Sequence, residues 1–128
     1  MRFSKGLCCA LLAAAAMAPV SAKAETILIF FDWGRTNLTP LAGKIVKSAR
    51  GLIGPSSTVT ITGHSDGSEP VALSEKRAAA VRAALIRAGA PKTATLTAVA
   101  RGAEAPLVQA TTPDGREPQN RRVQIDIP

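Results

Sequence analysis

The chain has 128 residues, with 16 lysines and arginines against 9 aspartates and glutamates, and a formal charge of +7 at neutral pH. If the export signal described below is removed with Arg2, Lys5 and Lys23, the charge falls from +7 to +4. Such a moderately basic balance suits an anionic polymer or a bilayer surface and specifies neither. Nucleic acid is disfavoured as a partner, because the chain leaves the cytoplasm and aromatic residues, which stack on bases, make up only 3% of it.

Residues 1–24 are predicted to be a cleaved secretory signal. A basic start is followed by an apolar stretch over residues 7–20 and then by small residues. Cleavage after Ala24 is preferred because the preceding residues fit the A-x-A pattern, and cleavage after Ala22 is the alternative. The apolar stretch is short for a membrane span and is interrupted by Pro19. We therefore expect a periplasmic protein, with outer-membrane association as a further option and no transmembrane span in the mature chain.

Both cysteines, Cys8 and Cys9, lie within this signal. A lipoprotein would carry its cysteine at the end of the apolar stretch, whereas these two lie near its beginning. The mature chain is therefore predicted to have no lipid anchor, no disulfide and no thiol nucleophile or ligand.

The first elements of the mature chain are a strand and a helix. Residues 25–31 are a continuous apolar run, which favours a central strand covered on both sides. A loop over 32–37 follows, and Thr39 with Pro40 is a typical helix start. Apolar residues then recur at helical spacing as far as the Gly54-Pro55 stop, at Leu41, Ile45, Ala49 and Leu52/Ile53.

The remaining pattern predicts three strands and one helix. In chain order these are a strand over 58–63, a loop over 64–69, a helix over about 70–88, a strand over 93–101, a long loop over 111–120 and a last strand over 123–127. The order β-α-β-α-β-β predicts an α/β fold, a two-layer sandwich with both helices packed on one face of a mixed sheet.

Arg77 is the most informative residue of the second helix. Steps of four residues place it in the apolar stripe together with Leu73, Val81 and Leu85. A guanidinium in such a stripe needs an anion, and Asp66, in the loop just before this helix, is the preferred candidate.

Asp66 lies in the loop that leaves strand 58–63, and loops at the carboxyl ends of strands are common ligand sites in α/β domains. Asp66 and Arg77 could neutralise each other as a structural pair. Alternatively, they could bracket a zwitterion, with the carboxylate on an ammonium group and the guanidinium on a carboxylate. Composition alone favours the structural pair, because paired charges are more often architecture than site.

Four segments in chain order resemble the successive signatures of the OmpA C-terminal-like domain family. They are IFFDWGRTNLTP (29–40), TGHSD (62–66), LSEKRA (73–78) and NRRV (120–123). The resemblance covers essentially all of residues 25–128, and it implies one OmpA-like domain over that range.

Members of that family bind the peptide stem of peptidoglycan without covalent chemistry, holding the zwitterionic end of meso-diaminopimelate. The resemblance implies that Asp66, from the TGHSD segment, and Arg77, from the LSEKRA segment, make this grip. Ser65 and Arg122 complete the predicted ligand-binding set. No catalytic or metal-binding residue and no cofactor are predicted.

The sequence departs from the family pattern in the segment between Asp66 and the LSEKRA helix. Residues 67–72 are a shorter connection than the family usually has, and Pro70 stands where an asparagine is expected. Gly34 also stands where some members have a ligand-facing asparagine. Contacts that the longer loop normally makes with the ligand are therefore in question.

The other chemically suggestive residues favour structural interpretations. His64 is expected to be a packed, hydrogen-bonded residue, because the mature chain has no second histidine or cysteine for a zinc site. Ser65 cannot form a triad with its two neighbours, because consecutive residues of an extended chain point in alternating directions. Trp33 could stack on a sugar ring or simply pack. Arg121 and Arg122 should face opposite ways at the start of the last strand.

Lys44, Lys47 and Arg50 form a basic stripe on the first helix. It is expected to be a solvated face, with contact to anionic lipid or wall polymer as the alternative.

These observations predict non-catalytic binding of peptidoglycan in the cell envelope, with envelope or outer-membrane proteins as further candidate partners. The alternative is a periplasmic protein-interaction or scaffold domain that has lost wall binding through the shortened loop. A wall hydrolase is disfavoured, because the sequence offers no suitably spaced carboxylate pair, metal set or nucleophile–base arrangement.

Overall fold

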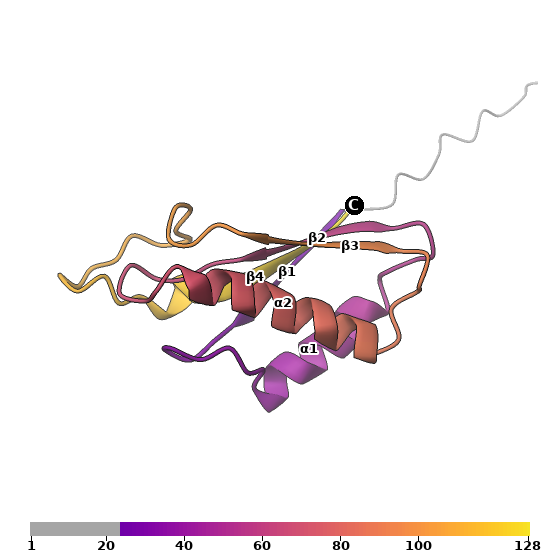
Figure 1. Cartoon of the computed structure of the whole chain (residues 1–128), viewed down its shortest axis with the longest axis horizontal. Helices are drawn as coiled ribbons and strands as arrows, with labels where there is room; N and C mark the ends of the chain where they lie inside the picture. Colours follow the sequence, from indigo (N-terminus) through magenta and orange to yellow (C-terminus); the bar gives the residue numbers. More distant parts are fainter. Residues whose placement is uncertain (1–23) are drawn as a thin grey trace, which may run out of the picture.

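The computed structural model describes residues 24–128, in which one four-stranded sheet carries two helices on the same face (Figure 1). The predicted export signal lies outside the described residues, apart from Ala24. The elements in chain order are β1 (Glu25–Phe30), α1 (Pro40–Arg50), β2 (Thr58–Gly63), α2 (Ala72–Arg87), β3 (Thr95–Ala100), a 3₁₀ helix (Pro118–Asn120) and β4 (Arg122–Ile127). The predicted fold class and order of elements are confirmed.

The sheet is mixed, with the strand order β1-β4-β2-β3. β4 pairs antiparallel with both β1 and β2, and β2 pairs parallel with β3 through the α2 crossover. Both strands with a clear period-two pattern bury their predicted face. Val59 and Ile61 of β2 and Val123 and Ile125 of β4 are fully buried, whereas the threonines of β2 lie on the other face.

Gly63, the last residue of β2, allows α2 to pack directly against the end of that strand. A Cβ atom built there would overlap the backbone carbonyl of Ser74 and crowd the Cβ of Ala78. Both neighbours belong to the turn of α2 that carries Arg77. This close approach therefore holds Arg77 at the carboxyl edge of the sheet.

β1 differs from its prediction. The apolar run was interpreted as a central strand covered on both sides, but β1 is an edge strand. Ile29 is fully buried while its neighbour Phe30 is 45% exposed, so only one face of the strand is covered. Phe30, on the uncovered face, lines a surface pocket. Sequence periodicity cannot distinguish an apolar residue that lines such a pocket from one that faces a buried layer.

α1 begins as predicted, with the Thr39 hydroxyl accepting the Ala42 N–H at 3.1 Å, and its buried stripe agrees with the prediction at Ala49 but not at Leu41. Ala42, Val46 and Ala49 are buried, whereas Leu41, predicted to face the core, is 67% exposed. The helix also ends at Arg50, before the Gly54-Pro55 stop. The small side chains of Ala42 and Ala49 face inward, which lets α1 pack close against its neighbours.

Candidate functional site

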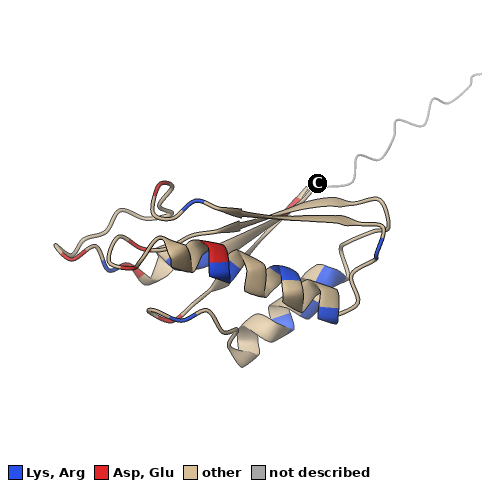
Figure 2. Ribbon diagram, in the orientation of Figure 1, with Lys and Arg blue, Asp and Glu red and all other residues tan. Residues whose placement is uncertain are grey.

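The residues singled out by the sequence gather at one edge of the sheet, where β1 and β2 end and the loops 31–39, 64–71 and 101–117 meet. In Figure 1 these loops extend from the same end of the molecule, beyond the first turn of α2. The basic stripe of α1, with all three side chains exposed, lies at a distance from this edge (Figure 2).

Arg77 lies in the apolar stripe of α2 as predicted and is completely buried. Its guanidinium makes a two-pronged ion pair with Glu69, with Nη1–Oε1 at 2.8 Å and Nη2–Oε2 at 2.5 Å. The remaining hydrogen bonds go to backbone carbonyls, from Nε to Arg35, from Nη1 to His64 and from Nη2 to Asp32, at 2.9, 3.1 and 3.3 Å. The guanidinium is thus fully engaged with its own chain.

Glu69 is the centre of this arrangement. Besides Arg77, its carboxylate accepts the backbone N–H groups of Gly34, at 2.8 Å, and of Asp66, at 3.0 Å. Burial alone would raise the pKa of Glu69, but the hydrogen bonds from Arg77, Gly34 and Asp66 outweigh it and hold this pKa below its ordinary value. Gly34 has a φ of +66°, a conformation that glycine adopts without steric cost.

Asp66 is buried but pairs with Arg121, not with Arg77. Its Oδ2 accepts Arg121 Nη1 at 3.0 Å and the Glu117 N–H at 3.1 Å, and its Oδ1 accepts both the N–H and the hydroxyl of Ser68. Burial would raise the pKa of Asp66, but the bonds from Ser68, Glu117 and Arg121 hold it below its ordinary value. The expectation that Asp66 would serve as the anion for Arg77 is therefore wrong. Each of the two pairs with a different partner.

The other two predicted ligand residues, Ser65 and Arg122, are also buried, at 2% and 4% exposure. Arg122 donates to the carbonyl of Ala105 at 3.0 Å, while its Nε and Nη1 and the Ser65 hydroxyl have no hydrogen-bond partner among the described residues. Arg121 and Arg122 have different partners: Arg121 donates to Asp66 and to the Phe31 carbonyl, and Arg122 donates to the Ala105 carbonyl.

His64 is packed as predicted, although its Nδ1 lacks a partner within residues 24–128. Burial, with the positive charges of Arg122 and Arg101, lowers its pKa to about 4. The imidazole is therefore neutral at pH 7.

Trp33 and Arg116 form the exposed rim above these pairs. The Arg116 guanidinium lies over the Trp33 ring, 4.5 Å from its centroid, and the indole N–H donates to the Ser68 hydroxyl at 3.0 Å. Trp33 is 47% exposed. One of its neighbours, Ser68, is thus hydrogen-bonded both to the rim and to buried Asp66.

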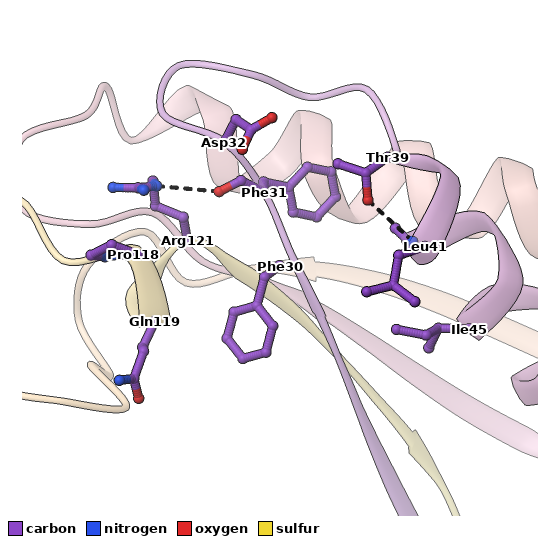
Figure 3. A pocket seen from close by; sticks show the side chains of 10 residues that line it. Phe30, Phe31, Asp32, Thr39, Leu41, Ile45, Pro118, Gln119 and Arg121 are labelled. Carbon is purple, nitrogen blue, oxygen red and sulfur yellow. Dashed lines mark hydrogen bonds between the residues drawn. The ribbon is translucent and has the colours of Figure 1, made fainter.

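Beside the ion pairs lies an open, largely apolar pocket of about 390 Å³, formed where β1, the start of α1 and the 3₁₀ helix meet (Figure 3). Phe30, Leu41 and Ile45 line its apolar side. Arg121 reaches it from the 3₁₀ end, where its Nε donates to the Phe31 carbonyl at 3.2 Å. The partner of Asp66 therefore borders a surface pocket, whereas Arg77 is enclosed.

Within residues 24–128, no group of histidine, aspartate and glutamate side chains is arranged to hold a metal ion. None of the helices in that range is long and apolar enough to cross a membrane.

The comparison with protein families identifies the domain. The model of the OmpA family matches residues 30–121, which include all four signature segments apart from their outermost residues. The chain belongs to the OmpA family. An "Outer membrane protein" of Gluconacetobacter diazotrophicus is 40% identical to this OmpA-family chain over an alignment of 114 residues, and the match covers 80% of the chain. The chain spans only 30% of that relative's length.

Solved structures share the fold at lower identity. The OmpA-like domain of FopA1 from Francisella tularensis subsp. tularensis SCHU S4 has a TM-score of 0.62 at 21% identity, covering 80% of this chain and 71% of that one. The peptidoglycan-associated lipoprotein from Burkholderia pseudomallei has a TM-score of 0.58 at 18% identity, covering 79% and 89%.

Glu69 is the residue of the site that sequence reasoning missed. A signal was present, because Glu69 precedes Pro70 in a loop too short to reach far from α2. Asp66 was preferred because it lies in the loop that leaves β2 just before α2, and the TGHSD segment that resembles the family signature then supported the same choice.

Proposed function

We propose that residues 25–128 form a non-catalytic module that binds the peptide stem of peptidoglycan in the cell envelope, after export directed by residues 1–24. Membership of the OmpA family supports this proposal. So do the names of a relative, an outer membrane protein, and of a protein that shares the fold, a peptidoglycan-associated lipoprotein.

The observation that carries the proposal is the environment of the Arg77 guanidinium. At the carboxyl edge of the sheet, its two terminal nitrogens and the backbone N–H groups of Gly34 and Asp66 converge on one place, which the Glu69 carboxylate fills in this structure. This geometry recognises a planar carboxylate. We name this set of donors the carboxylate cradle. Asp66, paired with Arg121 in this structure, is the nearby negative charge that we propose for an ammonium group, so the zwitterionic end of a peptide stem would match both sites.

Co-sedimentation with isolated sacculi tests the proposal. The wild-type protein should pellet with sacculi at moderate salt. Arg77→Lys should remain in the supernatant because lysine keeps the charge but loses the two-pronged geometry. Arg82→Lys, on the exposed side of the same helix, is the matched control and should pellet like the wild type. Circular dichroism verifies that the variants are folded. Wild-type protein that stays in the supernatant even at low salt would contradict the proposal.

A second candidate function has its own supporting observation. Asp66, Arg77, Ser65 and Arg122 are all at most 4% exposed, so none offers a surface to a ligand in this conformation. A periplasmic scaffold domain that has lost wall binding fits this burial. It predicts that wild-type protein does not pellet with sacculi but is crosslinked to envelope proteins in intact cells, also after the wall has been digested.

The proposal that the module is non-catalytic has a separate test. Labelled muropeptides incubated with the wild-type protein should be recovered unchanged. Their turnover, lost in a site variant, would revive the interpretation as a wall hydrolase.

A further inference from the structure

The Glu69 carboxylate makes the contacts that an external carboxylate would make in the carboxylate cradle. It accepts four hydrogen bonds, two from Arg77 and one each from the backbone N–H groups of Gly34 and Asp66. Its side chain is 0% exposed. The cradle is therefore filled by a carboxylate that the chain itself supplies.

We propose that Glu69 is an internal ligand, a tethered carboxylate that occupies the cradle and excludes an external one until residues 67–70 move outward. The inference rests on the proposed function for the nature of the external ligand, a peptide carboxylate. The proposal that Glu69 occupies the cradle does not depend on which external ligand binds there.

The cradle does not depend on Glu69 for its shape. Arg77 is fixed by α2 and by three backbone carbonyls, and the Gly34 N–H belongs to the loop after β1. Asp66 lies three residues after β2, and the residues between them, His64 and Ser65, are held by backbone hydrogen bonds to Arg122 and Gly102. Outward movement of residues 67–70 would leave these donors in place around an unpaired, buried guanidinium, which strongly favours binding of another anion.

Apart from the buried Glu69 side chain, the segment over residues 67–70 is held mainly by hydrogen bonds near the surface. Gly67 and Pro70, on either side of it, are exposed. Ser68 links the segment to Asp66 and to Trp33, and Gly67 packs on Gly115. Such a segment can exchange between closed and open positions without disturbing the core.

Protonation is not the trigger at neutral pH, because the contacts of Glu69 lower its pKa. Release must come from competition. A tethered group acts at an effective concentration on the order of millimolar or more. A free carboxylate can bind only while the cradle is open, so its apparent affinity is the intrinsic affinity multiplied by the fraction of time that the cradle is open. Removing the Glu69 carboxylate should tighten binding of a free carboxylate by at least about tenfold.

Chemical rescue by acetate tests the internal ligand directly. Glu69→Ala deletes a fragment the size of acetate, so acetate should raise the melting temperature of this variant above that in sodium chloride of equal ionic strength. Glu75→Ala, an exposed glutamate of α2, is the matched control and should not respond to acetate, and neither should the wild type. If Glu69→Ala is unfolded without acetate, the same titration should restore its circular dichroism.

Glu69→Gln provides a second variant. Glutamine keeps the shape of the occupant and part of its hydrogen bonding, so this variant should respond to acetate less than Glu69→Ala. Equal responses of Glu69→Ala and Glu75→Ala to acetate, or no recovery of an unfolded Glu69→Ala, would overturn the inference.

Sacculus binding by the same variants separates this inference from the proposed function. Stronger pelleting of Glu69→Ala than of the wild type supports both. Acetate rescue without pelleting by any variant supports the internal ligand and contradicts peptidoglycan binding. Equal pelleting of wild type and Glu69→Ala without acetate rescue contradicts the internal ligand and leaves the proposed function supported.

Trp33 offers an intrinsic reporter for the outward movement, since it is the chain's one tryptophan and is hydrogen-bonded to Ser68. Binding of a muropeptide to the wild type should shift its fluorescence emission, because the Ser68 contact breaks. Binding without any shift would contradict movement of this segment.

Discussion

Two buried ion pairs lie side by side at the carboxyl edge of the sheet, and they differ in how they meet the solvent. The side chains of Arg77 and Glu69 are both 0% exposed, and the guanidinium is saturated by one carboxylate and three carbonyls. In the other pair Asp66 is also fully buried, but Arg121 is 12% exposed and borders the open pocket. The comparison shows that burial of a charge does not by itself mark a ligand site. Whether a buried charged residue can bind a ligand depends on its ion-pair partner, which can belong to a core element or to a surface segment.

The largest effect should come from breaking the enclosed pair. Arg77→Ala leaves the Glu69 carboxylate buried and unpaired, which should lower the free energy of unfolding by about 3–5 kcal/mol. Urea unfolding measures this change. Lys76→Ala, the exposed neighbour on α2, is the control and should leave stability nearly unchanged. A loss below about 1 kcal/mol for Arg77→Ala would mean that water reaches the pair.

Breaking the second pair should cost less. Arg121→Ala removes one bond to Asp66 and one to the Phe31 carbonyl, yet Asp66 keeps its bonds from Ser68 and Glu117. We expect a loss of about 1.5–3 kcal/mol in the same urea experiment. Arg87→Ala, exposed at the end of α2, serves as the control. A loss equal to that of Arg77→Ala would remove the distinction between the two pairs.

The buried His64 makes the stability of the domain depend on pH. Its pKa is lowered to about 4, whereas the unfolded chain takes up this proton near the ordinary value of 6.5. Its contribution to stability is therefore complete above pH 6.5 and is lost as pH falls toward 4, by up to about 2 kcal/mol at pH 5. The depressed pKa values of Asp66 and Glu69 act in a lower window, below their ordinary values of 3.8 and 4.5. Urea unfolding of His64→Gln should therefore lack the slope between pH 6.5 and 5. A slope that persists in this variant would assign the effect to another group.

The smallest effect belongs to the rim. Arg116→Ala removes the cation above the Trp33 ring, which should lower stability by about 0.5–1 kcal/mol and change the fluorescence of Trp33. Arg87→Ala, exposed at the end of α2, is the control and should leave the fluorescence unchanged. An unchanged spectrum for Arg116→Ala would show that the two side chains are not stacked in solution.

The parts of this architecture that depend on local pattern were predictable from the sequence. The period-two strands, the Thr39 cap and the place of Arg77 in an apolar stripe all follow from neighbouring residues. The edge position of β1 was not predictable, because strand order depends on which strand β4 pairs with after a long loop. Glu69 was missed for a related reason. Asp66 binds Ser68, two residues further on, and Arg121, which is distant in the sequence. Arg77 therefore pairs with Glu69, in the loop before α2.

The most direct test of the central claim is a crystal structure of Glu69→Ala grown with acetate. The account predicts an acetate whose two oxygens face Arg77 Nη1 and Nη2 and accept the N–H groups of Gly34 and Asp66, with Asp66 still paired to Arg121. A structure in which Arg77 has instead turned to Asp66 or Asp32, with no acetate between them, would contradict it.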